Sequence, residues 1–231
     1  MTGTDKPTPV GSLPDATPST THVPAALTRL VWLLWVASLG ALVLRLRSDA
    51  AWELSGLVAV DGLTVLLWTV VTFLSGIVHS YSRRYMAGSA GIQRFFTRVF
   101  AFTLVVMLLV AADHVLLFAG AWLAMGLVMA DLIGYARSWP QARAAAALAR
   151  RYFLGSSALL GVALVTLWAA TGESTVSGVA TTNVPTAAWL IAATTLLLAA
   201  LIQSALLPFH TWLLSSMTAP TPASALMHAG F

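Results

Sequence analysis

The sequence predicts an all-α, polytopic transmembrane helix bundle, and three observations support this prediction. Of the 231 residues, 58% are hydrophobic and only 9% are charged, whereas roughly 25% of the residues in a soluble domain are charged. Six apolar segments each have about the 20 residues that a helix needs to cross the bilayer core. These segments lack the regular apolar–polar alternation of a membrane β-barrel. The solvent that surrounds most of this chain is therefore expected to be lipid.

The chain divides into a polar tail and a membrane domain. Residues 1–24 are rich in Thr, Pro and Ser and have no apolar period, so we predict a disordered cytoplasmic tail. Residues 25–231 are predicted to form one transmembrane domain. Its six spans are Leu27–Leu46, Leu57–Tyr81, Phe95–Ala111, His114–Tyr135, Tyr152–Ala170 and Ala187–Leu207.

Two of the predicted connections are informative. Only Ala112 and Asp113 separate the third span from the fourth, which predicts a tight helical hairpin. Residues 140–149 are rich in alanine, and two interpretations of them remain open. They form either a short helix along the membrane surface or an extension of the fifth span.

The distribution of arginine sets the predicted orientation. The two loops after the second and fourth spans share eight arginines: Arg83, Arg84, Arg94, Arg98, Arg137, Arg143, Arg150 and Arg151. The opposite face carries Arg45, Arg47 and Glu173. The positive-inside rule predicts that the eight-arginine face, and therefore also the N-terminus, lies on the cytoplasmic side.

Residues 203–231 carry the pattern most relevant to function. Pro208, Pro220 and Pro222 lie in an otherwise apolar segment, and proline cannot continue a helix because it lacks a backbone donor. In lipid, a broken helix is tolerated only where it is buried in protein or lines a wet cavity. With Gln203, His210 and His228 nearby, these residues alone allow an ion path or a re-entrant connector with interfacial histidines.

The segment PFHTWLLSSMTAPTPASALMHAG resembles the hallmark segment of the antiporter-like membrane subunits of respiratory complex I and the Mrp antiporters. Upstream, VDGL at 60–63, YMAG at 85–88, RFF at 94–96 and ADHVLLF at 112–118 resemble the same family in the same order. The resemblance runs from about Gly56 to the last residue. It implies the first half of an antiporter-like fold with a broken helix.

The sequences SSM at 215–217 and MHAG at 227–230 are most similar to the membrane subunit of the DAB inorganic carbon transporter. That resemblance implies a transporter subunit, not an enzyme, which couples cation movement, expected to be H⁺, to bicarbonate or CO₂ uptake. The implied partner is a large soluble zinc-binding subunit resembling a carbonic anhydrase. An L-type subunit of an NADH:quinone oxidoreductase, an Mrp-type antiporter and a scaffold without transport are the alternatives.

The chain departs from the family pattern at the residues expected to carry charge. The position of a family glutamate is occupied by Leu123, that of a lysine by Gln203, and that of a third acidic residue by Ser156. Intramembrane charged residues are costly and typically serve ion transport. Our remaining candidates for a proton path are therefore His228, Asp131, His210, Gln203 and Asp113, with His228 favoured.

Most of these candidates have an ordinary structural alternative. For His228 it is a neutral histidine bonded to a backbone carbonyl that the break leaves free. Asp131 forms a displaced acidic site or extends to the cytoplasmic face, while Asp113 and Asp61 are expected to cap helices. His79 and His114 are expected to pack at the membrane interface. We predict no metal site, since neither histidine of the broken segment has a second ligand at helical spacing. We also expect no cofactor and no nucleic-acid partner.

The resemblance also implies a partner half. The family fold pairs two inverted five-helix repeats, and these residues end just inside the last helix of the first repeat. We therefore expect a second-repeat half, as a continuation of the chain or as a separate product.

Overall fold

The computed structural model describes residues 22–47, 52–54, 56–89 and 91–229, so most of the predicted tail lies outside the described residues. Six described helices are long and apolar enough to cross a membrane, which confirms the six predicted spans. They are α1 (His22–Arg47), α2 (Gly62–Tyr85), α3 (Ile92–Ala111), α4 (Val115–Ile133), α5 (Pro140–Thr171) and α7 (Thr186–Gln203).

The remaining described elements are short. They are the strands β1 (Trp52–Leu54) and β2 (Val58–Val60), the helices α6 (Val176–Thr181), α8 (Thr211–Ser215) and α9 (Thr221–Ala229), and a 3₁₀ turn at Ser216–Thr218. The hairpin and α6 were not predicted, because segments of three to six residues carry no readable period.

Helix α5 decides the question about the alanine-rich residues. It continues for 32 residues without interruption, so residues 140–149 extend the fifth span. Pro140 begins the helix, at a position where its missing N–H costs nothing. Gly172 ends it in the left-handed conformation with φ 76°, which glycine adopts without steric cost.

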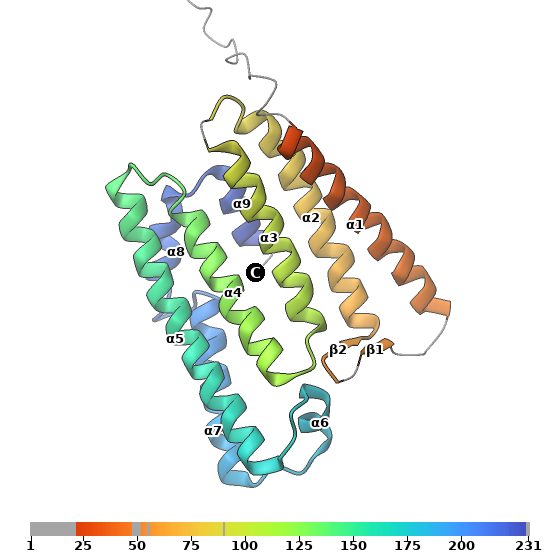
Figure 1. Ribbon diagram of the computed structural model, residues 1–231. Helices are drawn as coiled ribbons and strands as arrows, with labels where there is room; N and C mark the ends of the chain where they lie inside the picture. Colours follow the sequence, from red (N-terminus) through yellow and green to blue (C-terminus); the bar gives the residue numbers. More distant parts are fainter. Residues whose placement is uncertain (1–21, 48–51, 55, 90, 230–231) are drawn as a thin grey trace, which may run out of the picture.

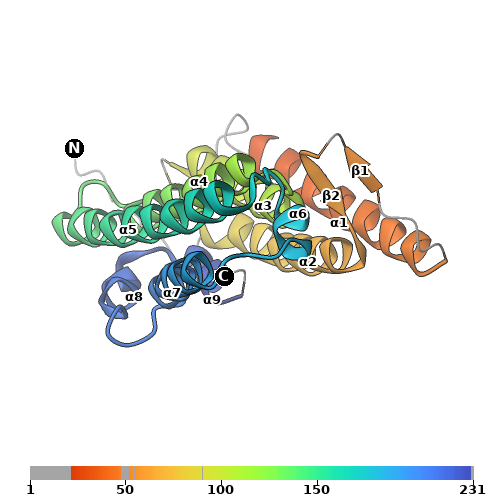
Figure 2. The same ribbon diagram turned by 90° about the horizontal axis from the view of Figure 1, so that it is seen from below.

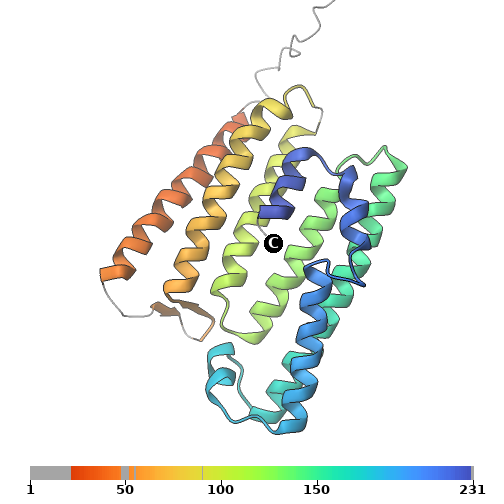
Figure 3. The ribbon, with the colours of Figure 1, turned by 180° about the vertical axis from the view of Figure 1, so that it is seen from behind.

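The helices form two layers. Helices α1, α2, α3, α4 and α5 lie side by side in one row (Figure 1). Helices α7, α8 and α9 lie together on one side of that row, with α7 packed along α5 and α9 along α2 (Figures 2 and 3). We call the end with the α2–α3 and α4–α5 loops the arginine-rich end, and the end with β1, β2 and α6 the hairpin end.

Backbone groups of the connections satisfy one another at the hairpin end. The carbonyl of Leu57 accepts from the amides of Asp113 at 2.9 Å and His114 at 3.2 Å. The amide of Val115 donates to Ser174 at 2.9 Å, and that of Val176 donates to Asp113 at 2.7 Å. The α3–α4 turn is therefore held between the β-hairpin and the α5–α6 connection.

Aromatic side chains fill the core between α2, α3, α4, α5 and α9, and Phe95, Phe96, Phe102 and Phe153 are fully buried. Glycines on α4 allow α5 to approach closely. A Cβ at Gly126 would lie 2.8 Å from Phe153 Cβ, and one at Gly134 would lie 2.7 Å from Ala146 Cβ. At Gly120, on the same helix, a Cβ would meet nothing within 4 Å.

This contrast predicts that Gly126→Ala lowers stability while Gly120→Ala preserves or raises it. Both substitutions improve helix propensity, but only the first forces α4 away from Phe153, at a cost of about 1–3 kcal/mol. Thermal unfolding of the detergent-solubilised protein measures the difference. An equal melting temperature for the two variants would contradict the close α4–α5 packing.

Asp61 confirms the predicted cap at the start of α2. Its Oδ1 accepts from the Thr64 amide and from the Thr64 hydroxyl, each at 2.7 Å. These hydrogen bonds, with the nearby Arg45 charge as a smaller cause, hold the pKa of this carboxyl below its usual value. A lowered folded-state pKa means that ionised Asp61 stabilises the fold above the unfolded pKa of about 4.

We therefore expect the stabilisation from Asp61 to be lost as the pH falls below about 4 and through the lowered folded-state pKa. Asp61→Ala should cost about 1 kcal/mol at pH 7, and Asp61→Asn, which keeps the cap, should cost less. Melting temperatures from pH 7 to pH 3 test this, with Glu53→Gln as the control for general loss of negative charge. A wild-type advantage over Asp61→Asn that does not shrink on acidification would contradict it.

Candidate functional site

The predicted helix interruption is present, but its prolines have different roles. Helix α7 ends at Gln203 and α8 begins at Thr211, with Pro208 in the loop between them. Pro220 precedes α9, and Pro222 is the second residue of α9, where proline is tolerated. Pro208 thus lies in one interruption, and Pro220 lies in a second one, between the turn at Ser216–Thr218 and α9. Pro222 alone differs from the expectation of a break, because it lies in the first turn of α9.

The carbonyls freed at the end of α7 find partners inside the protein. The buried indole of Trp212 donates to the Ile202 carbonyl at 2.9 Å, and the Leu206 amide donates to Leu201 at 3.0 Å. Trp212 also stacks edge-on against Phe153 with ring centroids 4.8 Å apart. The interruption is therefore anchored to the core through α8.

Two polar side chains at the interruption each have one buried atom without a hydrogen-bond partner in the described structure. Gln203 is 7% exposed and its Nε2 is buried and unbonded, and Nδ1 of His210 is also buried and unbonded. Buried polar atoms usually have a partner, either protein or ordered water. Gln203 and His210 bracket the loop, whose residues Leu206 and Leu207 are exposed, so each end of the loop has one buried polar atom that an ordered water could satisfy.

The position of the third expected acidic residue carries a neutral network instead. The hydroxyl of Ser156 accepts from the Trp122 indole at 3.2 Å and donates to the Ala199 carbonyl at 3.0 Å. This links α4, α5 and α7 without a titratable group. Leu123, next to Trp122, is apolar and partly buried.

Asp131 lies at the arginine-rich end, surrounded by arginines. Its Oδ2 pairs with Nε of Arg98, and its Oδ1 lies 3.8 Å from Nη2 of Arg94 and 3.6 Å from Nη2 of Arg137. A carboxylate so near a helix C-terminus opposes the helix dipole, and these cations compensate for it. The placement favours the interpretation in which Asp131 reaches the loop-bearing face rather than an internal cavity.

Asp113 forms capping hydrogen bonds, as expected, but to α6 and not to α4, which begins two residues after it. Its Oδ1 accepts from the Ser177 amide at 2.9 Å and its Oδ2 from the Ser177 hydroxyl at 2.7 Å, in the first turn of α6. The cap of α4 is His114, whose Nδ1 accepts from the Leu116 amide at 3.2 Å. Asp113 is thus tied to the hairpin end.

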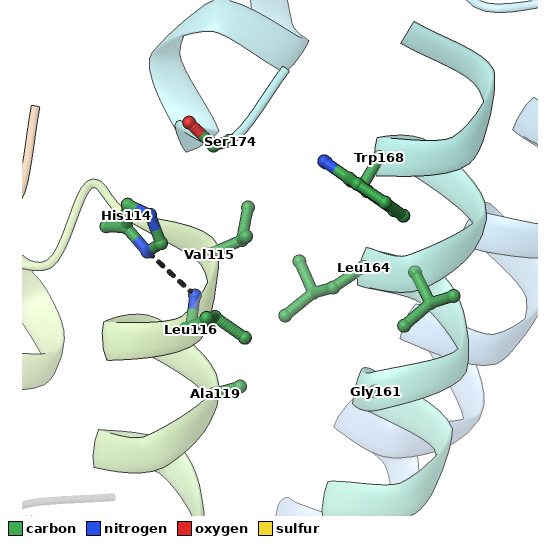
Figure 4. A pocket seen from close by; sticks show the side chains of 9 residues that line it. His114, Val115, Leu116, Ala119, Gly161, Leu164, Trp168 and Ser174 are labelled. Atoms are coloured by element: carbon green, nitrogen blue, oxygen red, sulfur yellow. Dashed lines mark hydrogen bonds between the residues drawn. The ribbon is translucent and has the colours of Figure 1, made fainter. Parts of the chain in front are cut away.

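A groove of about 420 Å³ lies beside His114, between α4 and α5 (Figure 4). Leu116 and Ala119 line one wall, and Leu164 and Trp168 line the other. Leu116 is 75% exposed, so this groove opens toward the surroundings of the bundle. Without a charged group in its lining, it suits hydrocarbon better than an ion.

His79 is the polar residue that the sequence interpretation misplaced. It was expected at the interface, but it is fully buried, because α2 continues to Tyr85 and places it about 9 Å inside the helix end. Its Nδ1 lies 2.8 Å from the Ser75 carbonyl, and the Ser75 hydroxyl lies 2.6 Å from that of Thr103. The spacing of Ser75 and His79, one helical turn apart, was the signal available in the sequence.

His79 has an unused polar atom and a notable neighbour. Its Nε2 is buried and has no hydrogen-bond partner in the described structure. Helix α9 packs along α2, with the Thr221 hydroxyl 3.1 Å from that of Tyr85. At about 1.5 Å per residue, the backbone of His228 comes close to the level of His79. The side chain of His228 lies outside the described part of the structure.

These features define a predominantly helical membrane protein with an interrupted helix and an apolar core that contains a few neutral polar groups. Two family models match the chain: the N-terminus of NADH-ubiquinone oxidoreductase (complex I) chain 5 at residues 51–96, and the NADH:quinone oxidoreductase/Mrp antiporter transmembrane region at residues 111–231. The chain therefore belongs to the NADH:quinone oxidoreductase/Mrp antiporter family of membrane subunits.

Individual relatives include both inorganic carbon transporter subunits and NADH-quinone oxidoreductase subunits. The chain is 37% identical over 190 residues to a probable inorganic carbon transporter subunit, DabB1, of Halothiobacillus neapolitanus, which covers 76% of this chain and 33% of the relative. It is 35% identical over 178 residues to NADH-quinone oxidoreductase subunit L of Escherichia coli, covering 73% of this chain and 28% of the relative. The chain thus spans about a third of the length of these curated relatives.

A solved structure agrees with the fold. The Mrp complex from a Dietzia species matches with a TM-score of 0.74 at 23% identity, covering 91% of this chain and 23% of the matched chain. The predicted antiporter-like helix bundle is therefore confirmed.

The arginine cluster around Asp131 yields a prediction. Asp131→Asn removes the carboxylate that three guanidinium groups share, so it should destabilise the protein by about 1–3 kcal/mol. Since these side chains are partly exposed, the loss should shrink at high salt. Thermal unfolding at low and high ionic strength measures this, with Glu53→Gln as the control; a salt-independent effect would contradict the ion-pair explanation.

Proposed function

We propose that this chain forms part of the membrane subunit of an inorganic carbon uptake complex. In this proposal, cation movement through the subunit, expected to be H⁺, is coupled to capture of bicarbonate or CO₂ by a soluble zinc-binding partner that resembles a carbonic anhydrase. The observation that carries the proposal is the 37% identity to a probable inorganic carbon transporter subunit. A second probable subunit of that kind from the same organism, DabB2, is 32% identical over 182 residues.

The polar interior supports a path based on histidine and not on lysine and glutamate. Gln203 and Leu123 stand where the family resemblance implies charged residues, and Ser156 is engaged in neutral hydrogen bonds. The buried side-chain atoms without a hydrogen-bond partner in the described residues include Nε2 of His79, Nε2 of Gln203 and Nδ1 of His210. Histidine is suited to carry protons because it titrates near neutral pH.

We infer a path along α9 and the α7–α8 loop, with His228 as the principal relay. His79 lies on the neighbouring helix at a similar depth, and His210 and Gln203 lie at the interruption. Water in the loop would connect these groups, since their unbonded atoms need partners. Asp131 and Asp113 belong to the two ends of the bundle in this proposal.

The orientation of the proposed subunit follows from its arginines. The positive-inside rule supports a cytoplasmic location of the arginine-rich end and of the start of α1, in what we propose is a bacterial plasma membrane. The soluble partner would then dock at that end, where Arg83, Arg84, Arg143 and Arg151 are exposed. The second-repeat half of the fold is the other expected partner within the membrane.

A respiratory role is the second candidate, favoured by the 35% identity to NADH-quinone oxidoreductase subunit L. Copurification separates the two candidates. The uptake proposal predicts a large soluble zinc protein in the purified complex, whereas other respiratory subunits would identify an NADH:quinone oxidoreductase. Measurement of proton flux in liposomes that contain the complex tests the third alternative, a scaffold without transport, because both transport roles predict a flux and a scaffold predicts none.

The histidine path predicts that His228→Ala abolishes complementation of a strain that requires high CO₂, without lowering the amount of complex in the membrane. His79→Gln should reduce growth in the same assay, because an amide cannot pass a proton between two ring nitrogens as an imidazole does. His22→Ala, at the exposed start of α1, is the matched control. Undiminished growth of His228→Ala in ambient air would rule out the relay.

A further inference from the structure

We propose that the groove between α3, α4 and α5 at the arginine-rich end binds the phosphate headgroup and the upper acyl chain of an anionic phospholipid. This site is separate from the proposed ion path, and its existence does not depend on the proposed function. The groove has a volume of about 460 Å³. Arg98, Asp131 and Arg150 line its polar part, and Ala101, Leu127 and Val128 line its apolar part.

The polar part has more positive charge than the protein neutralises. Asp131 is the one carboxylate in the groove lining, and it is already shared by the guanidinium groups of Arg94, Arg98 and Arg137. Arg150 faces the same groove from α5 without another carboxylate in the lining. An additional anion would therefore be attracted to this site.

A hydrogen-bond donor is also left over. Nη1 of Arg98, a residue of the groove lining, is buried and has no hydrogen-bond partner in the described structure. The side chain of Arg98 is only 20% exposed, so bulk water reaches it poorly. A guanidinium group donates well to phosphate oxygens, often through two N–H groups at once. An anion with several oxygen atoms would satisfy this donor.

The depth and the apolar part favour a lipid over a soluble anion. Arg98 lies six residues after the start of α3, with its backbone about 9 Å inside the helix end, and a long arginine side chain extends from that depth to the level of the lipid headgroups. Ala101 lies one turn deeper than Arg98, and Leu127 one turn deeper than Asp131, so the lining becomes apolar toward the membrane centre. A headgroup followed by an acyl chain matches this sequence of surfaces, whereas a free phosphate or bicarbonate uses only the arginines.

The test uses the purified full-length protein in nanodiscs that contain equal amounts of phosphatidylglycerol and phosphatidylcholine, followed by quantification of lipid retained after detergent extraction. Wild type should retain phosphatidylglycerol selectively, and Arg150→Gln should lower that retention roughly fivefold, because one arginine near an anionic surface contributes about this much. Arg151→Gln is the control, since Arg151 is also exposed on α5 but does not line the groove.

Leu127→Trp distinguishes the two sources of phosphate. It fills the apolar part and leaves all arginines in place, so it should also lower phosphatidylglycerol retention. Displacement of the lipid by inorganic phosphate or bicarbonate, with no effect of Leu127→Trp, would show a soluble-anion site and overturn the proposal. Equal retention of both lipids by wild type, or equal losses in Arg150→Gln and Arg151→Gln, would overturn it as well. Melting temperatures of all three variants verify that they are folded.

Discussion

Hydrocarbon offers a backbone amide or carbonyl no hydrogen-bond partner, and most of this structure follows from that constraint. Six helices satisfy their own backbone across the membrane. Where the chain leaves a helix, other segments supply the partners: Leu57 and Ser174 accept from the α3–α4 turn, and Trp212 donates to the end of α7. The interruption at Pro208 persists because α8 is packed into the core beside Phe153.

The same constraint separates charged from neutral polar groups. The ion pairs of Arg94, Arg98 and Arg137 all involve Asp131, at the arginine-rich end. Deeper in the bundle the polar groups are neutral: Ser156 with Trp122, Ser75 with Thr103, and the side chain of Gln203. A protein that carries protons through such an interior would depend on histidine and water, which is the basis of the proposed function.

Close packing of α4 against α5 connects the charged arginine-rich end with the neutral polar groups deeper in the bundle. Gly126 and Gly134 let α5 approach α4, which brings Ser156 to Trp122 in one half of the bundle. At the arginine-rich end, the same two helices and α3 form the groove with Arg98, Asp131 and Arg150. Helix α4 therefore supports both the neutral network of the interior and the charged groove at its margin.

The sequence alone determined the six spans, the arginine-rich end, the interruption at Pro208 and the family, because hydropathy, charge distribution and ordered motifs are readable within single segments. Only the tertiary structure decided the β-hairpin, the course of α5 through residues 140–149, the α6 partner of Asp113, the burial of His79 and the arginines around Asp131. Most of these depend on contacts between residues far apart in the chain. Contacts of this kind have no signature in the sequence of a single segment, so they become visible only when the folded structure brings the segments together.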